Sequence, residues 1–254
     1  LATTSGEISA YSGISHEKVR IMNLAGSALS ASNSCGTVYG SVGFPGSGAS
    51  ISRVSLGTEF KPISDEIIDE IKLMFTAANK TANVKSSRMK VLFMPNSAYS
   101  LNWRISAAVN AKNIYDKTSP LCSKFGEKIF SEKITVYDDP HDNSICLARA
   151  FDDEGTTTSR LPLFENGVLR NLFSDLNYAG KLNLKSSGHG FRTAQWCNDP
   201  VSLNPVPAAT NLRYQTGNKS VAQLIASIDR GIILENCLGA HSGNILNGDL
   251  SLGG

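Results

Sequence analysis

The sequence predicts an α+β protein with mixed or antiparallel sheets, a few packing helices and two subdomains. Strand-like runs gather in the first and last thirds of the chain, and the helical patterns lie mainly between them. The 254 residues are 41% hydrophobic, which is enough to build a substantial core. The polar stretch "NVKSSRM" is the best candidate boundary, and it divides the chain into residues 1–88 and 89–254.

The first 60 residues are rich in Ser, Gly and Ala and contain short strand-like runs, such as residues 18–24 and 51–57. A helix is expected next. Ser64 is a suitable N-cap, and Asp65 and Glu66 lie in the first turn. Apolar residues then repeat on one face at Ile67, Ile68, Ile71, Met74 and Phe75.

Residues 89–95 form a predicted buried strand that ends at Pro95, because proline cannot donate a hydrogen bond to a sheet. A second helix is expected to follow, with Leu101, Ile105, Ala108 and Val109 on one side. Residues 133–140 predict another strand, which runs into an acidic turn.

The strongest turn signal is Asn166-Gly167, which stands between the apolar runs 160–164 and 168–173 and predicts a β-hairpin. Near the end, Ser220 is a predicted N-cap and Gly231 a predicted C′ residue of a helix, followed by a strand at 232–238. Residues 249–252 alternate like the start of another strand, and the chain begins at Leu1. We therefore expect a piece of a longer chain.

Composition argues against several classes of protein. No apolar run approaches the roughly 20 residues that cross a bilayer. The net charge is +2 without a basic stripe, which argues against direct binding to nucleic acid. Five dispersed cysteines without a CxxC pair predict reduced thiols in a cytoplasmic protein. The four dispersed histidines form no HxxxH pair for a metal.

Asp152, Asp153, Glu154 and Gly155 form an acidic cluster that allows two interpretations. Neighbouring carboxylates repel one another unless a cation, an arginine or backbone N–H groups compensate them, so such clusters occur at metal and substrate sites. Asp side chains also cap turns, and the spacing favours a capped turn, because the cluster has no histidine partner near it in sequence. Similarly, "SSGHGFR", which contains Gly188 and Arg192, is either an anion-binding loop or a flexible turn.

Several motifs occur together in one order: "TVYDDP", "FDDEGTTTSRLPLFENGVLRNLFSDLNYAGKL", "SSGHGFR" and "RGIILENCLGAHSGNILNGDLSLGG". This succession resembles the TldD/PmbA family, also called the modulator of DNA gyrase family, whose members are associated with proteolysis and peptide maturation. The resemblance is strong from about Val91 to the end. It implies that residues 1–88 are the end of an α/β-type N-terminal domain and that residues 89–254 belong to a β-rich C-terminal domain.

Catalytic members of the TldD type carry an HExxxH helix, in which two imidazoles bind zinc and the glutamate acts as a base. The equivalent stretch here is residues 102–107, where Asn102, Trp103 and Ala107 replace the two histidines and the glutamate. The resemblance therefore implies a PmbA/TldE-type chain without catalytic or metal-binding residues of its own. Zinc, and the catalytic subunit, are expected in a TldD-type partner; a homodimer is the alternative.

The resemblance also implies an unstructured peptide as substrate. The residues expected at the peptide groove are Asp152, Asp153, Glu154, Gly155, Gly188 and Arg192. The acids would organise the turn before the 160–173 hairpin by pairing with Arg149, Arg160 or Arg192. Two other functions remain open: a stand-alone metal-dependent hydrolase that uses the acids with His189 or His241, and a non-enzymatic regulator of topoisomerase.

Overall fold

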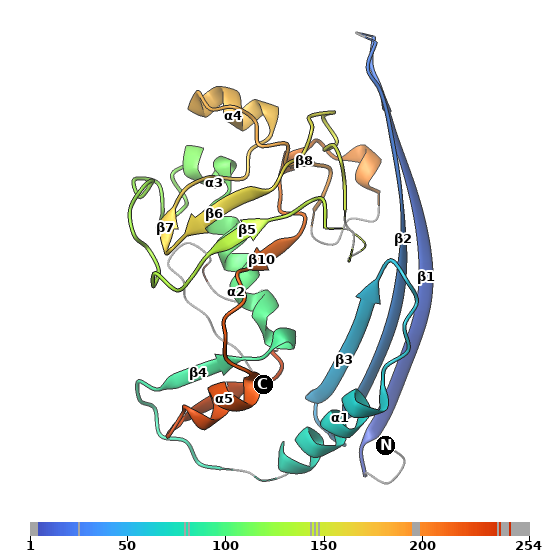
Figure 1. The fold of residues 1–254 in the computed structure, drawn as a ribbon, viewed down its shortest axis with the longest axis vertical. Helices are drawn as coiled ribbons and strands as arrows, with labels where there is room; N and C mark the ends of the chain where they lie inside the picture. The colour runs from blue at the N-terminus through green and yellow to red at the C-terminus, as the bar shows by residue number, and fades with distance from the viewer. Residues whose placement is uncertain are drawn as a thin grey trace.

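The computed structural model describes residues 5–24, 26–78, 80, 82–142, 144, 146, 148–194, 199–237, 239 and 244, and it confirms the α+β class. Figure 1 shows a long, narrow sheet beside a more compact part that is built of short strands and helices. The large first sheet has strands β1 (Glu7–Met22), β2 (Ala28–Gly43) and β3 (Ser50–Gly57). These strands are antiparallel and in the order β1-β2-β3.

Helix α1 (Asp65–Ala78) packs against this sheet through a small core of Val42, Ile51, Ile71 and Phe75. The rings of Phe44 and Phe75 stack with their centroids 4.5 Å apart. The helix expected after Ser64 and the strand expected at 51–57 are both confirmed. The run at 18–24 lies in β1, which ends at Met22. The great length of the β1–β2 hairpin is not visible in the Ser- and Gly-rich sequence.

The second sheet has the order β10-β5-β6-β7, formed by β10 (Leu212–Tyr214), β5 (Val136–Asp138), β6 (Leu161–Glu165) and β7 (Val168–Leu169). The predicted hairpin turn is confirmed, since Asn166 and Gly167 have φ angles of 50° and 79°. The second arm is shorter than expected, because pairing ends at Leu169 and not at residue 173. The main core lies against this sheet and consists of Val109, Leu121, Val136, Leu163, Phe164, Leu169 and Phe173.

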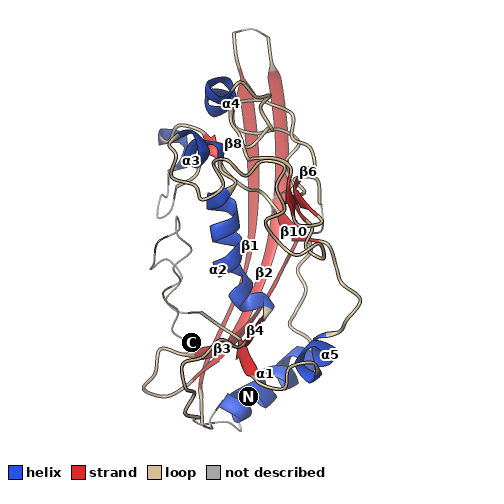
Figure 2. Ribbon diagram, turned by 90° about the vertical axis from the view of Figure 1, so that its left-hand side faces the viewer, coloured by secondary structure: helices blue, strands red, loops and turns tan. Residues whose placement is uncertain are grey.

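Helix α2 (Pro95–Ala108) runs from strand β4 (Lys90–Phe93) towards the second sheet (Figure 2). Strand β4 pairs in parallel with β11 (Gly231–Leu234). Helix α5 (Val221–Ala226) precedes β11, and Ser220 and Gln223 form its capping box. The predicted C′ role of Gly231 is wrong. Ser227 caps the helix and Gly231 opens β11, because the helix ends earlier than its apolar spacing indicated.

The sequence did not predict the short helices α3 (Ala111–Tyr115) and α4 (Leu176–Leu182), because their apolar faces are very short. Their N-caps are nonetheless regular, since Asn110 accepts a hydrogen bond from the Lys112 N–H and Asp175 from the Tyr178 N–H. The remaining elements are the strands β8 (Gly190–Phe191) and β9 (Val206–Pro207), which pair, and the 3₁₀ turn η1 (Pro200–Ser202).

The prediction of reduced thiols is wrong for two of the five cysteines, because Cys35 and Cys146 form a disulfide. It joins β2 to the loop after β5, across 111 residues of sequence. Sequence spacing could not reveal it, since only the fold brings strand and loop together. Cys122 and Cys237 are free, whereas Cys197 lies outside the described residues.

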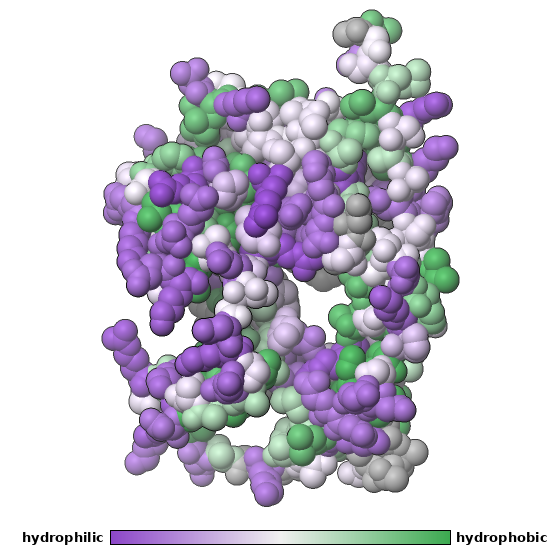
Figure 3. Space-filling model, in the orientation of Figure 1, coloured by the Kyte–Doolittle hydropathy of each residue, from purple (hydrophilic) through white to green (hydrophobic). Residues whose placement is uncertain are grey.

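Hydrophilic side chains dominate the face shown in Figure 3, where apolar groups are small and scattered. The surface is hollowed between the β1–β2–β3 sheet and the β4–β11 pair. Within the described part of the chain, no helix combines the length and the apolar character that a membrane span requires.

Candidate functional site

Asp152 is the structural centre of the acidic turn. Its side chain is completely buried, and its two carboxylate oxygens accept three backbone hydrogen bonds. Oδ1 accepts from the N–H groups of Glu154 (3.1 Å) and Thr156 (2.8 Å), and Oδ2 accepts from the Gly190 N–H (2.9 Å). The first two bonds close the turn, as expected of a capping aspartate. The third joins it to "SSGHGFR", the other segment selected from the sequence.

Asp153 joins the same two segments from its own side. Its Oδ1 accepts a hydrogen bond from the Arg149 guanidinium (2.6 Å), and its Oδ2 accepts one from the Arg192 backbone N–H (2.7 Å). The expected pairing with Arg149 is therefore present. The Arg149 guanidinium also lies over the rings of Phe151 and Phe191, at 5.9 and 5.3 Å from their centroids. Such stacking suits the flat, weakly hydrated guanidinium.

Glu154 adds a third segment, since its carboxylate accepts a hydrogen bond from the Leu176 N–H (2.7 Å) at the start of α4. Burial raises the pKa of Glu154, and the negative charges of Asp152 and Asp175 act in the same direction, whereas the Leu176 N–H opposes them. The three acids thus have three different sets of partners. They do not converge on one point as metal ligands do.

Three glycines allow these segments to approach closely. Gly155 and Gly188 have φ angles of 81° and 71°, a region in which residues with a Cβ are strained. A Cβ on Gly188 would lie 2.5 Å from the Thr157 carbonyl oxygen, and one on Gly190 would lie 2.4 Å from the Glu154 carboxylate. Gly190 was not selected from the sequence, although a second glycine two residues after Gly188 could have drawn attention to it.

The Arg192 side chain binds the segment around η1. Its guanidinium donates hydrogen bonds to the carbonyl oxygens of Val201 (3.0 Å) and Leu203, on either side of the end of η1. Of the three arginines expected to pair with the acids, Arg160 does not do so, because its guanidinium lies 3.7 Å from the ring centroid of Tyr137. Arg192 contacts Asp153 only through its backbone.

Asp138 and His189 form a second buried polar pair, which the sequence did not reveal. The His189 Nε2 lies 3.1 Å from the Asp138 Oδ2, and neither side chain is exposed. Asp138 also accepts hydrogen bonds from the Thr210 hydroxyl and from the N–H groups of Thr210 and Asn211. The pair ties β5 to the loop around Gly188 and to the segment before β10. His189 is therefore not directed at the acidic turn.

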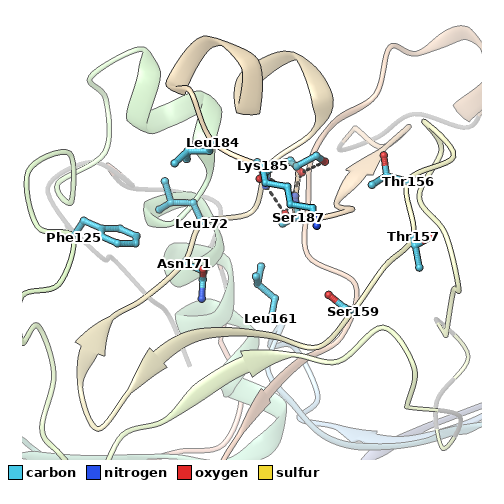
Figure 4. Close-up of a pocket in the computed structure, with 12 residues that line it drawn as sticks. Phe125, Thr156, Thr157, Ser159, Leu161, Asn171, Leu172, Leu184, Lys185 and Ser187 are labelled. Atoms are coloured by element: carbon cyan, nitrogen blue, oxygen red, sulfur yellow. Dashed lines mark hydrogen bonds between the residues drawn. The ribbon is translucent and has the colours of Figure 1, made fainter.

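A cavity of about 580 Å³ lies beside the acidic turn. Figure 4 shows its two halves: Thr156, Thr157 and Ser159 lie on one side, and Phe125, Leu172 and Leu184 on the other. Lys185 lies between them, and Leu161 and Asn171 lie in the lower part of this view. This size is typical of small-ligand and peptide sites. None of these residues was selected from the sequence; the hydroxyl run "TTTS" directly after the acids was the available signal.

The described residues do not fit a zinc ion. Asn102, Trp103 and Ala107, which the resemblance places at the positions of the zinc-binding helix, lie on α2, and none of them supplies an imidazole. The Asn102 side-chain oxygen accepts a hydrogen bond from the Tyr214 hydroxyl at 2.6 Å. Among the described residues, no group of three His, Cys, Asp or Glu side chains could hold a metal. His241, one of the two histidines that the hydrolase alternative could use, lies outside them.

Comparison with known proteins agrees with the resemblance found in the sequence. The family model for the PmbA/TldA metallopeptidase C-terminal domain matches residues 86–254. The uncharacterized protein MJ0231 of Methanocaldococcus jannaschii is 29% identical over 181 residues, which are 69% of this chain and 40% of that protein. The metalloprotease TldD homolog of Buchnera aphidicola is 32% identical over 124 residues, which are 49% of this chain and 24% of that protein.

Among solved structures, TldE from Thermococcus kodakarensis is similar in fold, with a TM-score of 0.84 and 25% sequence identity. The similarity covers 96% of this chain and 55% of that one. The chain thus spans about half, or less, of the length of the proteins that it matches.

Proposed function

Because the chain belongs to the PmbA/TldA metallopeptidase C-terminal domain family, we propose that it is a PmbA/TldE-like component of a TldD/TldE-type metalloprotease. In this proposal it takes part in proteolysis or peptide maturation in the cytoplasm and holds no catalytic zinc. The catalytic metal belongs to a TldD-type partner subunit. The similarity to TldE over nearly the whole chain supports this assignment.

The observation that carries the proposal is the set of side chains on α2. A zinc peptidase needs nitrogen ligands to fix the metal and a base to take a proton from water. The Asn102 side chain is held by Tyr214, the Ala107 side chain is a methyl group, and Trp103 has no basic atom. A subunit with these residues can bind and orient a peptide, but it cannot supply the hydrolytic metal site.

The acidic turn has a supporting role in this proposal. Asp152 and Asp153 bind the backbone of residues 190–192, and Glu154 binds the start of α4. Together with Gly155, Gly188 and Arg192, they hold the loops around the cavity in place and so shape the peptide groove. An unstructured peptide suits such a groove, since main-chain hydrogen bonds can supply affinity with little demand on sequence.

Reconstitution tests this proposal. The full chain and the TldD-type subunit from the same source are mixed and separated by gel filtration, and zinc is measured in each fraction. We expect a complex whose zinc is accounted for by the TldD-type subunit alone. Asp153→Ala in this chain should weaken assembly or peptide binding without changing the zinc content of the complex. About one zinc per isolated chain, lost on mutation of His189 or His241, would instead favour the stand-alone hydrolase.

A further inference from the structure

The cavity beside the acidic turn contains polar groups with no partner in the described part of the protein. Among the described residues, no hydrogen bond or ion pair engages the hydroxyls of Thr156, Thr157 and Ser159 or the Lys185 ammonium group. The other hydroxyls at the cavity are used internally: Ser174 and Ser187 bond to each other's backbone, and the Ser186 hydroxyl binds the Ser174 carbonyl oxygen. The hydroxyls without a partner therefore lie on one side of the cavity with Lys185 next to them, and Ser174, Ser186 and Ser187 form part of its wall.

The described side chains that line the cavity carry only positive charge. Among the described residues that line it, Lys185 is the only charged one, and none is Asp or Glu. The acids closest to these residues in sequence have partners of their own. Asp152 is buried under the turn, and Asp153 is bound to Arg149 and to the Arg192 N–H. Glu154 accepts a hydrogen bond from the Leu176 N–H, and Asp175 accepts one from the Tyr178 N–H. One ammonium group with neighbouring hydroxyls suits a ligand group with a single negative charge, such as a carboxylate.

The opposite half of the cavity is apolar and open. Phe125 and Leu184 are 63% and 48% exposed, and with Leu172 they face the cavity. Large apolar side chains that stay exposed at the edge of a cavity indicate a contact surface. Figure 4 shows that this half lies across the cavity from the threonines.

We propose that this cavity binds the C-terminal residue of a peptide, with the free α-carboxylate at Lys185, Thr156 and Ser159 and an apolar side chain against Phe125, Leu172 and Leu184. A C-terminal Leu, Met or Phe carries both groups on one α-carbon, which matches the division of the cavity. The inference rests on the proposed function only in taking a peptide as the ligand. It adds a preference that main-chain contacts alone would not give.

The acidic turn is connected directly to this site. Asp152 accepts a hydrogen bond from the Thr156 N–H, and so fixes the threonine run relative to Gly190. The Gly188 conformation lets the Ser186–Ser187 wall pass close to the Thr157 carbonyl oxygen. The residues selected from the sequence thus position the cavity, and the residues that would touch the ligand lie next to them.

The test is a binding titration with the full chain and dye-labelled peptides, followed by fluorescence anisotropy. Two peptides of the same unstructured sequence end in leucine, one with a free carboxylate and one with a C-terminal amide. We expect the free acid to bind about three- to tenfold more tightly, as a charge-assisted contact at a half-open site would provide. Lys185→Gln should remove this difference. Lys133→Gln, which changes an exposed lysine outside the cavity, should preserve it.

A second pair of measurements examines the apolar half. Leu184→Ser changes an exposed side chain, and it should reduce the preference for a terminal leucine over a terminal glycine while keeping the preference for the free acid. The melting temperature of each variant is measured as well, and a value equal to that of the wild type shows that the fold is kept.

Equal binding of acid and amide by the wild-type chain, or a difference that survives Lys185→Gln, would overturn the inference. Full recovery of binding by an amidated peptide with an internal aspartate would overturn it too, because the site would then read a side-chain carboxylate. The inference would also be overturned if the wild-type chain bound neither peptide. None of these results depends on cleavage, so activity of the reconstituted protease remains a separate test of the proposed function.

Discussion

Among single residues, Asp152 contributes most to the local structure of the acidic turn. Its replacement by alanine would leave the N–H groups of Glu154, Thr156 and Gly190 without their acceptor in a buried place. We therefore expect Asp152→Ala to lower the free energy of unfolding by about 3–5 kcal/mol, measured by urea denaturation.

Asp229→Ala is the matched control, since Asp229 is exposed and has no hydrogen-bond partner in the described part of the chain. It should change stability by less than about 0.5 kcal/mol. A loss of similar size in both variants would show that the three backbone hydrogen bonds at Asp152 do not hold the turn.

Glu154 gives a prediction with a definite sign in pH. Its folded-state pKa is raised above the ordinary 4.5, chiefly by burial, so the folded protein favours the protonated form. Its contribution to stability is complete below the unfolded pKa and is lost as pH rises through the folded pKa. Glu154→Gln keeps an oxygen for the Leu176 N–H but carries no charge.

The melting temperature of Glu154→Gln should therefore equal that of the wild type near about pH 4 and exceed it slightly near about pH 7.5. Part of the Glu154 side chain is in contact with water, so the difference should be small. A variant less stable than the wild type at the higher pH would mean that the Glu154 charge stabilises the fold.

At the scale of elements, the β6–β7 turn depends on Gly167. The N–H of Gly167 donates to the Ile134 carbonyl oxygen, and its own carbonyl oxygen accepts from the N–H groups of Ile129 and Phe130. A Cβ at this position would lie 2.2 Å from the Phe130 carbonyl oxygen. Gly167→Ala should accordingly lower the free energy of unfolding by about 2–4 kcal/mol.

Substitution of Gly126 separates the cost of the left-handed conformation from the cost of steric crowding. It has the same φ angle of 79°, but nothing lies within 4 Å of a Cβ placed on it. Gly126→Ala should cost only the left-handed conformation, about 1 kcal/mol. Equal losses in the two variants, measured by chemical denaturation, would show that the close approach to Phe130 is unimportant.

Local chemistry explains which elements the sequence could predict. The Asn166-Gly167 turn, the α1 periodicity and the Ser220 cap are each specified within a few residues, and each is present in the structure. The end of α5 was misjudged, because Ile228 continues the apolar spacing beyond the helix. The β1–β2 hairpin has little apolar alternation, since most of β1 faces solvent.

Long-range contacts explain what the sequence could not show at the site. The acidic turn and "SSGHGFR" were both selected, but their connection through Asp152 and Gly190 spans 38 residues. The Asp138–His189 pair and the Cys35–Cys146 disulfide span 51 and 111 residues. Pairings of this kind depend on the complete fold, and no spacing rule within one element predicts them.

At the scale of the whole molecule, we propose that this chain binds the peptide and that a second subunit carries out catalysis. The cavity, the turn that positions it and α2 lie in the part of the chain that the PmbA/TldA family model matches. The side chains on α2 do not suit a metal, whereas the cavity residues suit a peptide end. In this proposal the chain shapes the substrate site, and the TldD-type subunit cleaves the substrate.

Peptide cleavage by the isolated full chain, after chelator treatment and gel filtration, is the sharpest test of this division of roles. The substrate is an unstructured peptide, and the same assay is repeated with the TldD-type subunit added. We predict no turnover above background by the chain alone and clear turnover by the mixture. Robust cleavage by the chain alone, abolished by Asp153→Ala or Glu154→Ala, would contradict the proposal and make the acidic turn a catalytic centre.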